Sequence, residues 1–120
     1  MWLIETTETF DKWFRGLDDV DRENVLASIL VLRHFGPRLG RPHADTVKGS
    51  GYPNMKELRI QSKGKPVRAF FAFDPARNGV LLCGGNKGDG DKRFYEKQIA
   101  LADREFAQHL ESLKRSGNDG

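Results

Sequence analysis

Three short strand-like runs separated by turns constrain the fold of this chain more than any other feature. They lie between Asn54 and Asn86, where apolar and polar residues alternate as in half-buried strands. The two connections, residues 62–64 and 74–79, are short and rich in turn-forming residues, which favours antiparallel hairpins. We therefore expect an antiparallel meander with strands over residues 55–61, 65–73 and 79–83.

Apolar residues at helical spacing predict two helices before this meander. We expect Thr6 or Thr7 to cap the first helix and Asp18 or Asp19 to cap the second, because their side-chain oxygens can accept hydrogen bonds from unpaired helix N–H groups. Residues 36–37, Gly-Pro, should end the second helix. The apolar stripes are Phe10, Trp13, Phe14 and Leu17 in the first helix and Val25, Ile29, Leu32 and Phe35 in the second.

The remaining segments complete an α+β arrangement. Residues 1–5 alternate weakly and predict an opening strand, residues 38–53 a long loop, and residues 84–88 a flexible hinge. A last helix capped by Asp91 should follow, with a tail at 116–120 that looks disordered. Its apolar stripe is Tyr95, Ile99, Ala102, Phe106, Leu110 and Leu113. The prediction is one domain over residues 1–115: an N-terminal strand and a two-helix hairpin on an antiparallel sheet of about four strands, plus a C-terminal helix.

Length and composition favour a soluble cytoplasmic protein. A chain of 120 residues can bury a compact core without disulfide bonds. No segment reaches the roughly 20 apolar residues of a membrane span, and the N-terminus lacks the basic start and apolar run of a secretory signal. The single cysteine, Cys83, excludes an internal disulfide and a cysteine-based zinc site.

Positive charge is concentrated in the middle of the chain. Residues 41–97 contain 12 basic and 6 acidic residues, a balance of +6, whereas residues 1–40 and 98–120 have balances of −2 and −1. Such a block is either a solvated lysine-rich surface or a binding surface for a polyanion.

Strand alternation places three charged residues on one side of the sheet. Glu57 and Arg59 share a face of their strand, and Arg68 lies on the corresponding face of the next strand. We expect the helices to cover the opposite, apolar face, which would leave these three residues together on an uncovered face. A surface ion pair is one explanation. The other is phosphodiester chemistry on RNA.

RNA cleavage by the ribose 2′-OH needs these residue types. A carboxylate can take the 2′-OH proton, and arginine can bond two oxygens of the phosphate as negative charge develops there. No metal is required. His34, His43 and His109 also lack the spacing of metal ligands.

The sequence resembles the HigB branch of the RelE/ParE toxins of bacterial and phage toxin–antitoxin modules. The motifs are MKELR, VRAFFAFDP, VLLCGGNKG and FYEKQIALA, with FDKWF, LRHFG and LGRPHADTVKGS before them. They cover about residues 1–113. The resemblance implies a RelE-like fold and, for many members, a toxin that enters the ribosome and cuts mRNA. It also implies a small helix-turn-helix antitoxin of the HigA type, which with the toxin represses their operon by binding operator DNA.

The resemblance also suggests roles for residues. It implies that Glu57 is the general base, that Arg68 contacts the scissile phosphate, that Arg59 is catalytic or structural, and that Lys87 contacts phosphate or replaces the acid. No C-terminal histidine pair matches the acid of several relatives, and a tyrosine or lysine would need a lowered pKa to serve. His109 should be a surface or packing residue. Further RNA-binding candidates are His43, Lys56, Lys65, Lys92, Tyr95 and Lys97.

Two other functions compete with the ribonuclease. Some ParE relatives poison DNA gyrase without catalysis, and the missing histidine pair favours that class. An inactive chain that only binds an antitoxin and regulates transcription is the third possibility.

Overall fold

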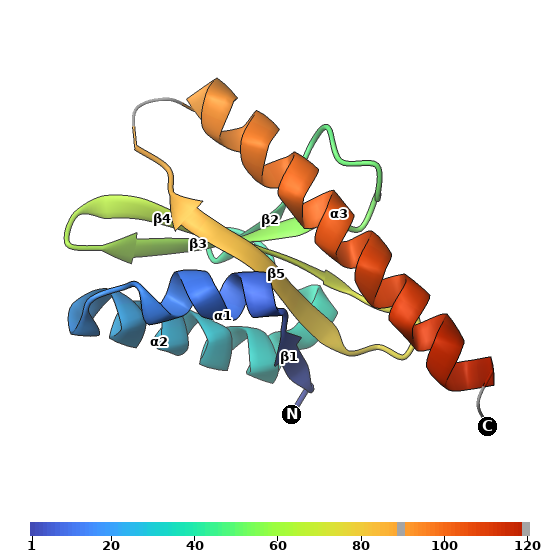
Figure 1. Ribbon diagram of the computed structural model, residues 1–120. Coiled ribbons are helices and arrows are strands. Elements are labelled where there is room, and N and C mark those ends of the chain that lie inside the picture. The colour runs from blue at the N-terminus through green and yellow to red at the C-terminus, as the bar shows by residue number, and fades with distance from the viewer. Residues whose placement is uncertain (89–90, 119–120) are drawn as a thin grey trace.

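The computed structural model describes residues 1–88 and 91–118 as an α+β fold. Figure 1 shows a twisted sheet with α1 and α2 on one side and α3 running diagonally across the other. The elements are β1 (Ile4–Thr6), α1 (Glu8–Arg15), α2 (Asp19–Phe35), the 3-10 turn η1 (Gly36–Arg38), β2 (Ala44–Thr46), β3 (Lys56–Ser62), β4 (Lys65–Phe73), β5 (Gly79–Asn86) and α3 (Asp91–Asn118).

The sheet has five strands in the order β1-β5-β4-β3-β2. The predicted meander is confirmed, since β3, β4 and β5 pair antiparallel. The expected count of about four strands is one too low, because β2 lies inside the segment expected to be loop and pairs antiparallel with β3. The opening strand is displaced to Ile4–Thr6 and pairs parallel with β5, so the sheet is mixed rather than purely antiparallel.

The helix-start signals are confirmed at both N-terminal helices. The Thr7 hydroxyl accepts a hydrogen bond from the Phe10 N–H at 3.1 Å, and the Asp18 carboxylate accepts one from the Asp21 N–H at 2.9 Å. The second helix ends at Phe35, as the Gly-Pro pair predicts, and Gly36 adopts a positive φ of 64°. A Cβ at Gly36 would also lie 2.4 Å from the Trp2 ring.

Residues 84–86 are strand, which corrects the predicted hinge over 84–88. Two glycines in β5 admit large side chains from opposite sides of the sheet. A Cβ at Gly84 would lie 2.4 Å from the Trp13 ring of α1, and one at Gly85 would lie 2.9 Å from the Phe94 ring of α3. The absence of side chains at these two glycines therefore lets α1 and α3 pack closely on β5, rather than making the strand flexible.

Two apolar clusters lie on the two faces of the sheet. The first joins α1 and α2 to residues that include Leu58, Val67 and Phe71. The second joins α3 to residues that include Phe70 and Leu82. The prediction that this face is uncovered is therefore partly wrong, since α3 covers it over β4 and β5. The reason is that apolar side chains such as Phe70 share the face with Arg68 and are buried against the helix.

The last helix begins at Asp91 and continues to Asn118. The tail expected over 116–120 is thus helical in its first three residues, and residues 119–120 lie outside the described part of the chain. Within that part, no helix is long and apolar enough to cross a membrane. The Cys83 thiol is buried, which raises its pKa to about 12 and keeps it uncharged.

His109 anchors α3 to the turn between β4 and β5. Its Nε2 lies 2.8 Å from the carboxylate of Asp74, whose side chain is fully buried, and its ring stacks on Phe106. The predicted packing role of His109 is confirmed. Glu5, Asp74 and His109 have ligand atoms within 4.8 Å of one another, but the two ring nitrogens face different carboxylates.

We expect His109→Ala to lower the free energy of unfolding by about 1.5–3 kcal/mol, because a buried carboxylate loses its hydrogen-bonded partner. Chemical denaturation would measure this loss. His34→Ala is the matched control, since His34 is exposed on α2. Equal effects of the two substitutions would contradict the anchoring role.

Candidate functional site

Glu57 and Arg68 form a buried ion pair on the sheet face that carries α3. Arg59 lies directly opposite Arg68 in the β3–β4 register, and Glu57 is one step along the same face of β3. The Nε of Arg68 lies 3.5 Å from Oε1 of Glu57, and their side chains are only 6% and 10% exposed. The predicted convergence of these groups is confirmed, but the pair is buried rather than open.

Tyr95 of α3 completes the pair from above the sheet. Its hydroxyl donates a hydrogen bond to Oε1 of Glu57 at 2.6 Å. Its ring makes edge contacts with Phe70 and Phe94, which hold it over the strands. A helix residue therefore orients the carboxylate that a strand supplies.

The environment keeps the Tyr95 hydroxyl protonated. Burial raises the pKa of Tyr95 to about 12, with the hydrogen bond to Glu57 and that carboxylate's charge as further causes, whereas Arg68 acts in the opposite direction. At neutral pH Tyr95 is a hydrogen-bond donor. The lowered pKa that an acid role was expected to require is not found at this residue.

Arg68 is oriented and still has bonding capacity. Its Nη1 donates to the Val67 carbonyl at 3.1 Å, and its buried Nε faces the Glu57 carboxylate in the ion pair without forming a hydrogen bond. Arg68 also lines a depression of about 270 Å³ with Arg59, Gln61 and Pro42. A phosphate in that depression would meet two guanidinium groups.

Lys87 lies at the end of the cluster that is nearer the start of α3. Its backbone N–H donates to the Pro66 carbonyl at 2.9 Å, which ties it to β4. Its Nζ lies 5.9 Å from the centre of the Tyr95 ring and 3.6 Å from the Asp91 carboxylate. Lys87 is thus placed beside Tyr95, as its position after the last strand suggests.

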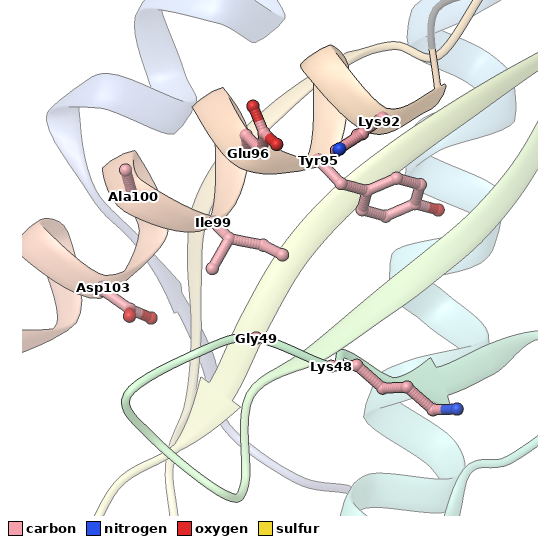
Figure 2. Close-up of a pocket in the computed structure, with 8 residues that line it drawn as sticks. All are labelled: Lys48, Gly49, Lys92, Tyr95, Glu96, Ile99, Ala100 and Asp103. Carbon is pink, nitrogen blue, oxygen red and sulfur yellow. The ribbon is translucent and has the colours of Figure 1, made fainter.

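Two further depressions adjoin this cluster. One, of about 260 Å³, is lined by Glu57 and Tyr95 together with residues of β2 and the segment after it. The other, of about 520 Å³, lies between residues 48–49 and α3 (Figure 2). Lys48 and Tyr95 border both. Glu57 of the ion pair therefore lines the smaller depression, which adjoins the larger one at Lys48 and Tyr95.

Comparison with known proteins places this arrangement in a family. Residues 12–107 match the family described as phage derived protein Gp49-like. The chain belongs to the Gp49-like family. Two relatives from Mycobacterium tuberculosis are named as candidate toxins. HigB2 is 48% identical over 110 residues, which are 91% of this chain and 54% of HigB2. HigB3 is 42% identical over 107 residues, which are 89% of this chain and 92% of HigB3.

The Gp49-like chain spans about half the length of HigB2 and most of HigB3. Its fold is also similar to a chain of the intact Escherichia coli RelBE toxin–antitoxin complex, with a TM-score of 0.55 and 15% identity over 71% of this chain and 95% of that one. At that identity the likeness concerns the fold alone. The predicted membership of the HigB branch and the RelE-like fold are both confirmed.

Two of the predicted RNA-binding residues lie on the opposite face of the sheet from the ion pair. The Nζ of Lys56 donates to the Pro37 carbonyl at 2.9 Å on the α2 side, so Lys56 is on the wrong face. Lys65 belongs to the face opposite Arg68 and is exposed at the start of β4. Lys97 is exposed on α3. His43 is exposed just before β2, and its carbonyl accepts a hydrogen bond from the Arg59 N–H at 2.8 Å, so it lies beside Arg59. Lys92, in contrast, lines the larger depression with Tyr95.

Sequence reasoning missed three charged residues beside the site. Arg41 and Asp45 form an ion pair with 2.7 Å between Nη2 and Oδ2, and the hydrogen bond from Arg41 holds the pKa of Asp45 below its usual value. Lys48 follows β2 at the junction of two depressions. The sequence carries no strand alternation for β2, since Ala44 and Val47 are buried on either side of the more exposed Asp45 and Thr46.

We expect the Tyr95 phenol to titrate near pH 12, which ultraviolet difference absorption would measure against Tyr95→Phe. A folded-state pKa above the ordinary 10.0 stabilises the fold fully below pH 10, and this contribution is lost as pH rises toward 12. The free energy of unfolding should therefore fall more steeply over that range in the wild type than in Tyr95→Phe. Parallel curves would contradict the contact with Glu57.

Proposed function

We propose that this Gp49-like chain is the toxin of a type II toxin–antitoxin module and that it cuts mRNA on the ribosome as a metal-independent endoribonuclease. The observation that carries the proposal is the buried Glu57–Arg68 pair beneath Tyr95, whose carboxylate borders a surface depression. Burying an ion pair costs free energy that its own attraction often does not recover. Such buried charged groups are common in active sites. The named HigB relatives support the same class.

In the proposed reaction Glu57 is the general base. Its carboxylate takes the proton of a ribose 2′-OH, whose oxygen forms a bond to the adjacent phosphorus. The bond from phosphorus to the 5′ oxygen breaks, which leaves a 2′,3′-cyclic phosphate and a 5′-OH. The hydrogen bond from Tyr95 holds the carboxylate in one orientation while its second oxygen faces the substrate.

Arg68 and Arg59 supply the positive charge that this reaction needs. Negative charge grows on the non-bridging phosphate oxygens as the new bond forms, and guanidinium groups fixed before the reaction stabilise it without reorganisation. The two residues face each other across β3 and β4 and line one depression. Arg68 is the more fixed of the two, because it also bonds to the backbone and faces Glu57.

Lys87 is proposed to contact the scissile phosphate or to replace the missing acid at the leaving 5′ oxygen. It is a cation beside Tyr95, and it comes from the end of β5 rather than from the strands that hold the base. A base and an acid on different elements fit an in-line displacement, in which the entering and leaving oxygens lie on opposite sides of phosphorus.

The proposed partners are an antitoxin, the ribosome and mRNA. A helix-turn-helix antitoxin of the HigA type would neutralise the toxin, and operator DNA would be bound only through their complex. The RelE-like chain similar to this one was solved within a toxin–antitoxin complex, which supports the proposal of a protein partner. Phosphate contacts by the basic residues should make ribosome binding weaken steeply with salt.

We expect Glu57→Gln to reduce mRNA cutting by about 100-fold or more, because the amide keeps the shape of the carboxylate but cannot accept the proton. Lys87→Met should also reduce it, since the ammonium is removed with little change in length. The measurement is the mapping of 5′ ends after induction without antitoxin. Lys114→Met, an exposed lysine near the end of α3, is the matched control.

Folding is checked by circular dichroism, because Glu57→Gln leaves Arg68 without its counter-charge. Folded variants that cut as well as the wild type would refute the catalytic assignments. Growth arrest by the wild type with no mRNA cuts and with blocked DNA supercoiling would instead favour the gyrase-poison class.

A further inference from the structure

The depression between α3 and residues 48–49, which shares Tyr95 with the Glu57 site, has no part in the reaction described above. Figure 2 shows Tyr95, Ile99 and Asp103 along the helix and the loop with Lys48 and Gly49 below it. Its volume of about 520 Å³ lies within the range of small-ligand sites, about 300–1,000 Å³. The depression is large enough to hold part of a substrate.

The loop that forms one wall is fastened to the helix that forms the other. The Asp103 carboxylate accepts hydrogen bonds from the Ser50 hydroxyl at 2.5 Å and from the Gly51 N–H at 2.8 Å. The Tyr52 ring makes an edge contact with the Phe106 ring, with 4.9 Å between the ring centres. These contacts hold the two walls apart at a set spacing, so the depression is preformed rather than a consequence of a loose loop.

The walls combine the groups that a single-stranded nucleotide requires. Tyr95 and Ile99 offer apolar and aromatic surface for a base, and Lys48 and Lys92 offer positive charge for its phosphates. Glu96 adds a carboxylate on the helix side. The Glu96 side chain is exposed and borders the depression, so its two oxygens are accessible to a ligand there.

We propose that this depression binds the base next to the cut and that Glu96 selects guanine there. The proposal rests on the ribonuclease function proposed above. Tyr95 borders both the depression and the Glu57 site, so the nucleotide beside the scissile phosphate lies within reach. The Watson–Crick edge of guanine presents two adjacent donors, which match the two oxygens of a carboxylate, whereas adenine, cytosine and uracil present one donor beside acceptors.

The test maps mRNA cuts after induction of the full chain without antitoxin. The wild type should show guanine enriched at one set position beside the cut. Glu96→Gln should reduce this preference by about 5- to 150-fold, the range expected for one bidentate base contact, while cutting beside other bases continues. Glu111→Gln removes the same charge about 22 Å away along α3 and should leave the preference unchanged.

A second pair of variants fills the depression without altering charge. Ala100 and Ala107 are both exposed on α3, seven residues apart and therefore on the same side of the helix, but only Ala100 lines the depression. Ala100→Trp should reduce guanine-directed cutting, and Ala107→Trp should not. This comparison separates occlusion of the depression from any general effect of an added indole.

The outcomes distinguish the two proposals. Absence of cuts in the wild type overturns the ribonuclease function itself. Cuts with no base preference, with a preference for another base, or with a guanine preference that Glu96→Gln and Ala100→Trp both leave intact overturn only the base-binding assignment. A guanine preference that is lost in Glu96→Gln and kept in Glu111→Gln supports it.

Discussion

The contact of α3 with the second face of the sheet is the interaction on which the candidate site depends. The helix can approach this closely because Gly85 has no side chain. A Cβ at that position would lie only 2.9 Å from the Phe94 ring. Because α3 packs closely on the sheet, the Tyr95 hydroxyl reaches Glu57 and donates a hydrogen bond of 2.6 Å to its carboxylate. The same contact creates the depression beside residues 48–49, because the helix also forms one of its walls.

Burial changes what the Glu57–Arg68 pair can do. On an open surface such a pair would contribute about 0–1 kcal/mol and would be screened by salt. Beneath Tyr95 the charges are largely desolvated, so they attract each other more strongly but also cost more to bury. The raised pKa of Tyr95 reports the same environment. The net contribution of such a pair to stability is therefore small, although removing one partner would leave an uncompensated buried charge.

Much of the fold follows from local patterns, and the errors have identifiable physical causes. Strand alternation placed Glu57, Arg59 and Arg68 on one face, and the caps at Thr7 and Asp18 begin the helices where hydrogen-bonding side chains were expected. The short β2 was missed because its three residues gain their order from pairing with β3, which no local propensity encodes. The prediction of a hinge over residues 84–88 failed because Gly84 and Gly85 permit α1 and α3 to pack closely on β5, which a flexible segment would not require.

The sequence by itself determined the meander, the helices, the family and the charged residues that share a face, since these depend on periodicity, capping and motif order along the chain. Only the tertiary structure decided that α3 covers this face, that Tyr95 orients Glu57, that Lys56 points the other way, and that a preformed depression lies alongside. Those outcomes depend on contacts between residues 19 to 53 positions apart, such as Lys56 with Pro37 and Asp103 with Ser50, and local pattern carries no information about distances of that kind.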